Sequence, residues 1–280
     1  MVGFYEQPVT RITGMGLIFD IRSCRLYESW YQSPRGRAMD HFIERFIPEI
    51  IEPQPYERVL DIGCGTGNHL LLFSKLGLDI SGLDASPYMI DMAKKRLGNR
   101  CTLKTGMAED LPFDDNEFDL VILINSLEFL DDPVQALKEA GRVAKRKVFI
   151  TVTNAFSLSY TYDRVRTLFR ETIHQYMKSY NLWGLKSKVQ EAYGPVPIEW
   201  RCEQSWASYQ RDSSGSSPHM RGLRGWPFGS FLGLAATMRY RLKTDNLPLK
   251  LRINKREESA ASGITSMRNR ESAPPVDVVL

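Results

Sequence analysis

Short apolar runs alternate with segments of helical periodicity between residues 37 and 153. Apolar residues three and four positions apart predict helices, whereas short continuous apolar runs predict strands. The pattern predicts helices over 37–51, 69–76, 87–97 and 133–143, and strands over 58–62, 79–84, 101–105, 118–124 and 147–153. The run 118–124 is apolar apart from Asp119, as expected of a parallel strand that is buried on both faces. Repeated strand–helix units of this kind predict an α/β fold whose parallel sheet is covered by helices on both sides.

The alternation becomes less regular after Asn154. Residues 157–180 are rich in Tyr, Arg and Phe and are predicted to be helical, which fits an inserted cap over about 155–181. The later elements are predicted as a helix over 182–192, a strand over 198–206, a loop over 207–226 and a final strand over 228–240. Residues 255–280 lack periodicity, and their composition predicts a disordered tail.

Charge and cysteine content narrow the possible classes of function. No apolar run approaches the roughly 18 residues of a membrane span, and the N-terminus lacks the pattern of a signal peptide, so we expect a cytoplasmic protein. The four cysteines form no CxxC pair and the histidines show no ligand spacing, which argues against a disulfide framework and against a metal site. The net charge is +4, and without aromatic residues interleaved among basic ones it predicts no nucleic-acid partner.

The excess of basic residues lies late in the chain, at Arg239, Arg241, Lys243, Lys250, Arg252, Lys255 and Arg256. A solvated surface is one interpretation of this stretch. The alternative is a surface for an anionic substrate or for phospholipid headgroups, which would give the protein a peripheral membrane contact.

A glycine-rich loop, G-C-G-T-G at residues 63–67, follows the first predicted strand of the sheet. Between a parallel strand and a helix, such a loop exposes backbone N–H groups and lets a ligand approach the backbone closely. An acid at the end of the next strand, about 20 residues further on, can accept hydrogen bonds from a ribose diol. Asp84 stands at this position, so the arrangement predicts a cofactor that carries adenosine.

The spacing of the loop separates two kinds of cofactor. Dinucleotide-binding loops read G-x-G-x-x-G, but Asn68 stands where their third glycine would be. Asp61 precedes the loop on the strand, where an acid would repel a pyrophosphate and suits the ammonium group of a methionine-like ligand. A dinucleotide-dependent oxidoreductase is therefore disfavoured.

Residues 58 to about 153 resemble the class I S-adenosylmethionine-dependent methyltransferases, in particular the group that includes the quinone-biosynthesis C-methyltransferases. VLDIGCGTGNHL is similar to their first motif, GLDASPYMIDMAKKRL to the second strand and its helix, and AEDLPFDDNEFDLVI to the third loop and fourth strand. NLWGLKSKVQEAYG and PFGSFLGLAATMRY resemble the last helix and the antiparallel closing strand more loosely. The resemblance implies a Rossmann-like, doubly wound sheet of seven strands, mostly parallel with an antiparallel closing strand, and a helical cap insertion.

The resemblance also implies S-adenosylmethionine as the cofactor, and it assigns roles by position. Asp61 would orient its amino group, Asp84 would bind the ribose hydroxyls, and Met89 would lie near the adenine. Met107 stands where the family often has an acid for the adenine amino group, so Glu109 or a backbone carbonyl would take over that contact. The full set of expected cofactor contacts is Asp61, Gly63, Cys64, Gly65, Gly67, Asp84, Ala85, Met89, Ala108, Glu109, Asn125, Tyr31 and Arg35.

The N-terminal residues extend this interpretation. Similar segments cover the cofactor as a lid in the family, which would make residues 1–36 a lid and residues 37–254 the methyltransferase domain. Tyr31 or Arg35 would then meet the carboxylate of the cofactor. Simple packing on the edge of the sheet is the alternative for both residues.

Methyl transfer needs a general base only where the acceptor has to lose a proton. Glu128 follows the fourth predicted strand, where relatives often carry a histidine, and is the candidate base; a solvated acid at a helix N-terminus is the alternative. Asn125, at the end of that strand, would lie near the sulfonium. The aromatic residues of the cap are either core or the wall for an apolar small-molecule acceptor. Two functions follow: a small-molecule methyltransferase, or an inactive cofactor-binding or scaffolding subunit with the same fold.

Overall fold

The computed structural model describes residues 9–11, 17–157, 160, 177–203 and 227–238. Several predictions concern residues outside these ranges: most of the cap, the loop over 207–226, the basic stretch that begins at Arg239, and the tail over 255–280. In the described part of the chain, no helix is long and apolar enough to cross a membrane. No group of three or more acidic, histidine or cysteine side chains within the described ranges is arranged to hold a metal ion.

Seven strands form one sheet in the order β5-β4-β3-β6-β7-β9-β8. These strands are β3 (Arg58–Ile62), β4 (Asp79–Asp84), β5 (Thr102–Thr105), β6 (Phe118–Ile124), β7 (Ala144–Thr153), β8 (Ile198–Glu203) and β9 (Phe231–Thr237). Strands β5 to β7 are parallel to one another, and β9 lies between β7 and β8, antiparallel to both. The predicted seven-stranded, mostly parallel sheet is confirmed, and the antiparallel closing strand lies one position inside the edge.

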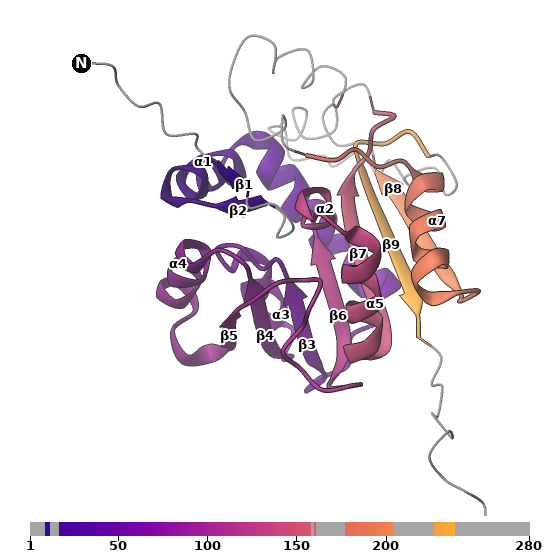
Figure 1. Ribbon diagram of the computed structural model, residues 1–280, viewed down its shortest axis with the longest axis horizontal. Helices are drawn as coiled ribbons and strands as arrows, with labels where there is room; N and C mark the ends of the chain where they lie inside the picture. Colours follow the sequence, from indigo (N-terminus) through magenta and orange to yellow (C-terminus); the bar gives the residue numbers. More distant parts are fainter. Residues whose placement is uncertain (1–8, 12–16, 158–159, 161–176, 204–226, 239–280) are drawn as a thin grey trace, which may run out of the picture. The chain divides into compact units, whose positions relative to one another are not determined.

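Helices cover both faces of the sheet, as predicted (Figure 1). The described α-helices are α1 (Ile21–Tyr31), α2 (Pro34–Ile50), α3 (Asn68–Lys75), α4 (Pro87–Leu97), α5 (Pro133–Val143) and α7 (Leu182–Tyr193). Neighbouring residues of a strand point to opposite faces, so Val59 joins the core formed with α2, α3 and α4, whereas Leu60 joins the core formed with α5 and α7. This two-sided burial explains why these strands read as continuous apolar runs.

Two elements begin earlier than the apolar pattern predicts. Helix α2 begins at Pro34 rather than residue 37, because Ser33 caps it by accepting a hydrogen bond from the Gly36 N–H (3.3 Å) and proline suits the first turn. The boundary expected between lid and domain at residue 36 therefore falls within a helix. Strand β7 begins at Ala144 rather than residue 147, because Ala144 still pairs with Phe118 across an irregularity in the ladder.

The described part of the N-terminal segment folds into a short hairpin and a helix. Strands β1 (Val9–Arg11) and β2 (Leu17–Phe19) pair in antiparallel fashion, and α1 follows directly. Asp20 caps α1 by accepting a hydrogen bond from the Ser23 N–H (2.7 Å). The segment lies at the end of the sheet where the parallel strands finish (Figure 1). The apolar pattern did not predict this hairpin, because its strands are only three residues long.

Candidate active site

The loop between β3 and α3 depends on its glycines. Gly63, Gly65 and Gly67 have φ angles of 74°, 51° and 78°, a left-handed conformation that glycine adopts without steric cost. A Cβ atom at Gly63 would also lie 2.5 Å from the Cβ of Ser126, which follows β6. The glycine at position 63 therefore serves two purposes, since it turns the chain and lets two loops approach each other closely.

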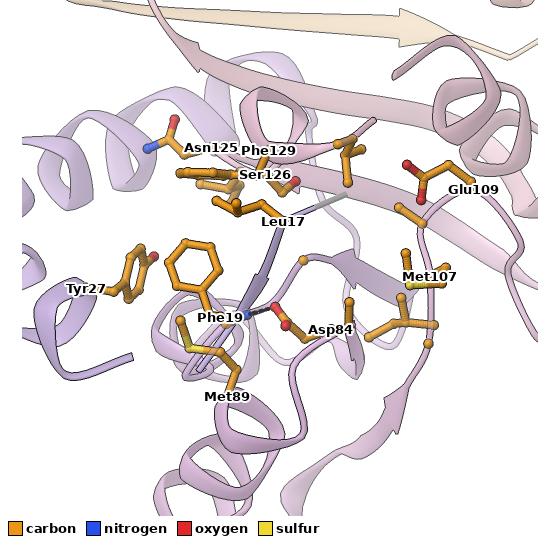
Figure 2. A pocket seen from close by; sticks show the side chains of 18 residues that line it. Leu17, Phe19, Tyr27, Asp84, Met89, Met107, Glu109, Asn125, Ser126 and Phe129 are labelled. Atoms are coloured by element: carbon orange, nitrogen blue, oxygen red, sulfur yellow. Dashed lines mark hydrogen bonds between the residues drawn. The ribbon is translucent and has the colours of Figure 1, made fainter. Parts of the chain in front are cut away.

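Asp84 ends β4 and is joined to the glycine loop by hydrogen bonds. One carboxylate oxygen accepts from the Gly65 N–H (2.9 Å) and the other from the Ser86 N–H (2.8 Å) (Figure 2). Burial raises the pKa of Asp84 to about 6, although the two N–H groups favour the charged form. Because each carboxylate oxygen has more than one lone pair, the side chain can still accept further hydrogen bonds.

Asp61 is the most unusual polar group of the site. It lies on β3 two residues before Gly63, its side chain is 1% exposed, and neither carboxyl oxygen has a hydrogen-bond partner among the described residues. Burial, with a smaller contribution from the charge of Asp84, raises its pKa to about 8. A buried acid without a partner costs free energy, so this position calls for a ligand that brings a hydrogen-bond donor or a cation.

A cavity opens beside the glycine loop at the carboxyl ends of β3, β4 and β6. Its volume is about 680 Å³ when the mouth is included, which is within the usual range for small-molecule sites. Among its lining residues are eight of the predicted contacts: Gly63, Gly65, Asp84, Ala85, Met89, Ala108, Glu109 and Asn125. The structure thus brings together residues from four separate segments of the sequence (Figure 2).

Two of these residues offer polar groups at different places on the wall. Asn125 has a φ of 50°, which asparagine tolerates better than most residues, and its N–H donates to the Thr151 carbonyl (3.0 Å). Glu109 accepts from the Asp132 N–H (3.4 Å) through one carboxylate oxygen, while its other oxygen is buried and has no partner among the described residues. Glu109 lies beside Met107 (Figure 2), so it can take over the acidic role that Met107 cannot provide.

Other predicted contacts do not reach the cavity wall. Cys64 and Gly67 belong to the glycine loop but face away from the cavity, and the side chain of Arg35 is not described. Tyr31 donates its hydroxyl hydrogen bond to Asp40 instead, and its ring meets the His69 ring edge-on at 5.7 Å. Tyr31 therefore packs between helices.

Glu128 is buried beside the cavity rather than on its wall. The side chain is 1% exposed, so the alternative of a solvated acid is wrong. One carboxylate oxygen accepts from the Thr153 N–H (2.9 Å) at the end of β7, and the other has no partner among the described residues. Burial raises the pKa of Glu128 to about 7. Its neighbours Ser126 and Phe129 line the cavity, whereas Glu128 does not, and its role as a base stays a prediction.

The sequence analysis missed the apolar part of the wall. Leu17 and Phe19 come from β2, Tyr27 from α1, and Phe129 from the short helix η2 (Leu127–Phe129). The Phe19 carbonyl accepts a hydrogen bond from the Ser86 hydroxyl (2.6 Å), which ties the hairpin to the loop after β4. Residue alternation in so short a strand gives no detectable signal.

Comparisons with known proteins agree with this geometry. Residues 60–152 match the family model described as a methyltransferase domain. This segment is a class I methyltransferase domain. A crystal structure of a SAM-dependent methyltransferase from Thermotoga maritima shares the fold, with a TM-score of 0.58, 20% identity, and coverage of 78% of this chain and 97% of that chain.

Curated relatives of the methyltransferase domain include two quinone-related enzymes. The demethylmenaquinone methyltransferase of Thermotoga maritima is 37% identical over 106 residues, which cover 37% of this chain and 45% of that protein. The 2-methyl-6-phytyl-1,4-hydroquinone methyltransferase of Arabidopsis thaliana is 30% identical over 171 residues, which cover 55% of this chain and 49% of that protein. The chain thus spans less than half the length of each of these relatives.

Proposed function

We propose that this protein is an S-adenosylmethionine-dependent methyltransferase that acts on an apolar small molecule. The observation that carries the proposal is the buried carboxyl group of Asp61, which has no partner among the described residues and lies next to a glycine loop and a second acid, Asp84. An ammonium group bound to Asp61 would supply both the missing hydrogen-bond donors and the missing charge.

The residues of the site fit the parts of this cofactor. Asp84 would accept hydrogen bonds from the ribose hydroxyls through the lone pairs that the Gly65 and Ser86 N–H groups leave free. Asp61 would hold the amino group. At the other end of the cavity, the free oxygen of Glu109 would accept from the adenine amino group. The sulfonium supplies a methyl group that is already activated for transfer.

The protein's part in such a reaction is to position the reactants and to exclude water. Methyl transfer is an in-line displacement, so holding the acceptor in line with the methyl group provides much of the acceleration. Asn125, at the end of β6, would help to orient the acceptor. The apolar side chains Leu17, Ile124 and Leu130 on the cavity wall would exclude water.

The acceptor class follows from the wall and from the relatives. Leu17, Ile124, Phe129 and Leu130 give the cavity a large apolar surface, which suits an acceptor with a ring or hydrocarbon character. The names of two relatives specify quinone-related acceptors. A quinol-like molecule is therefore the first acceptor to test.

A specific observation supports the second candidate, an inactive cofactor-binding subunit. The acids that line the described cavity wall are Asp84 and Glu109, and both have binding roles in the proposal above. Glu128, the candidate base, is off the wall. A protein of this kind would bind the cofactor without turning it over.

Two measurements test the proposal. Titration calorimetry with S-adenosylhomocysteine should show micromolar binding that Asp84→Ala abolishes, with Asp79→Asn as the control because Asp79 lies exposed at the opposite end of the same strand. Incubation with S-adenosylmethionine carrying a labelled methyl group and a quinol acceptor should then produce a labelled product. Binding without transfer to any acceptor in a metabolite extract would favour the inactive subunit, and absence of binding would refute both.

A further inference from the structure

Three aromatic rings from three different elements form a continuous row along the cavity. The Phe19 ring meets the Phe129 ring edge-on, with centroids 5.3 Å apart, and the Tyr27 ring edge-on, with centroids 6.3 Å apart. Figure 2 shows Tyr27 and Phe19 side by side, with Phe129 on the facing wall. The row, Tyr27–Phe19–Phe129, is called the aromatic wall below.

Negative charge gathers at the Tyr27 end of the aromatic wall. Burial raises the pKa of the Tyr27 hydroxyl, and the charges of Asp61, Asp84, Asp40 and Glu28 raise it further. Glu28 is neutralised by Arg96, at 2.8 Å. Neither Asp61 nor Asp84 forms an ion pair with a cation within the described ranges, so this end of the cavity keeps an excess of negative charge.

The position of the cofactor's sulfur follows from its covalent structure. One methylene group joins the sulfur to the ribose, and a short carbon chain joins it to the amino group. If Asp84 binds the ribose and Asp61 the amino group, the sulfur lies between these two acids. Tyr27 is near both of them, and it lies against Gly65, where an added Cβ would be 3.7 Å from the ring.

We propose that the aromatic wall selects the charge of the cofactor, binding the positively charged sulfonium in preference to the neutral thioether. The inference rests on the proposed function. Aromatic faces attract cations, and the unpaired acids add to that attraction. In methyl transfer the acceptor's electron pair forms the new bond, and the sulfur keeps the electrons of the broken S–CH₃ bond and becomes neutral. The product therefore loses the attraction, which favours its release.

Calorimetry with three ligands tests this selectivity. S-adenosylmethionine carries a methylsulfonium, sinefungin carries an ammonium group in its place, and S-adenosylhomocysteine is neutral at the sulfur. All three share the adenine, ribose and amino acid. The wild-type protein should bind the two cationic ligands about 2- to 30-fold more tightly than the neutral one. Phe129→Leu and Phe19→Leu should bring this ratio close to one.

Two further variants make the result specific to the aromatic wall. Tyr27→Phe keeps the ring and should keep the ratio. Glu109→Gln alters the adenine end and should weaken the binding of all three ligands by the same factor. Near-ultraviolet circular dichroism of each variant reports whether its fold is intact.

The outcomes separate this inference from the proposed function. Equal affinities in the wild-type protein, or equal losses for all three ligands in both leucine variants, would overturn the charge selection while leaving the proposed cofactor site in place. If none of the three ligands binds, the proposed function fails and this inference fails with it. A leucine variant that has lost its fold is replaced by the other one for the comparison.

Discussion

Glu28 of α1 and Arg96 of α4 form an ion pair at 2.8 Å, and both side chains also bind Thr66 of the glycine loop. The Arg96 guanidinium donates to the Thr66 carbonyl and to its hydroxyl, each at 2.7 Å. The two charged side chains are only 15% and 26% exposed. This cluster joins the N-terminal segment to the loop that the proposed cofactor would contact.

Glu28→Gln should weaken both stability and ligand binding. Removing one member of a partly buried pair leaves the other charge without its partner, so we expect a loss of about 1–3 kcal/mol in the free energy of unfolding. Affinity for S-adenosylhomocysteine should fall about 3- to 10-fold, because α1 also holds Tyr27 against the loop. Urea denaturation and calorimetry measure the two effects.

The exposed pair Arg58–Asp79 provides the control for this experiment. Its side chains are 44% and 70% exposed and its atoms are 3.9 Å apart, so Asp79→Asn should cost less than about 0.5 kcal/mol. An equal cost for the two substitutions would show that the Glu28 pair does not stabilise the attachment of α1.

Gly63→Ala should be more damaging than the same substitution at Gly77. Both glycines have a φ close to 75°, so alanine at either site suffers similar backbone strain, about 1 kcal/mol. At Gly63 the new methyl group also meets Ser126, whereas at Gly77 no atom lies within 4 Å. We expect a further cost of about 1–3 kcal/mol at Gly63, measured by urea denaturation, and a loss of ligand binding there alone. Equal destabilisation would mean that the Ser126 contact relaxes without cost.

Asp61 should make the ligand-free protein less stable as the pH rises. Its pKa in the folded state is about 8, above the ordinary value of 3.8. The folded protein therefore holds a proton that the unfolded chain releases between these values. The associated stability is complete below about pH 4 and is lost progressively as the pH rises through about 8.

Asp61→Asn should remove this pH dependence. The variant should be less stable than the wild-type protein at pH 5, where its amide lacks partners, and should regain on the order of 2 kcal/mol relative to the wild-type protein at pH 8.5. Urea denaturation at the two pH values measures the change. The same pH slope in both proteins would show that Asp61 is charged throughout this range.

Glu128→Gln distinguishes a structural role from a catalytic one. Glutamine keeps an oxygen that accepts from the Thr153 N–H, the contact that Glu128 makes at 2.9 Å. Because Glu128 is off the cavity wall, we expect kcat to stay within about threefold of the wild-type value. A fall of about 100-fold or more, with loss of a titration near pH 7 in the rate profile, would instead assign Glu128 as the general base.

The sequence by itself determined the parallel sheet and the glycine loop, because both depend on features that are local in the chain. Continuous apolar runs require burial on both faces, and Gly63, Gly65 and Gly67 are needed by a turn within a few residues of themselves. Asp61 and Asp84 could be predicted because each stands at the end of a strand that is easily recognised. The order of parallel strands then brings them to one edge of the sheet.

Tertiary structure decided which side chains complete the cavity wall. Tyr27 reaches the cavity whereas Tyr31, one helical turn later, binds Asp40, and periodicity within α1 cannot separate two residues on the same helical face. Glu128 is buried because the end of β7, more than 20 residues away, donates an N–H to it. Such contacts join residues that are distant in sequence, so only the packing of α1, the hairpin and η2 against the sheet could place them.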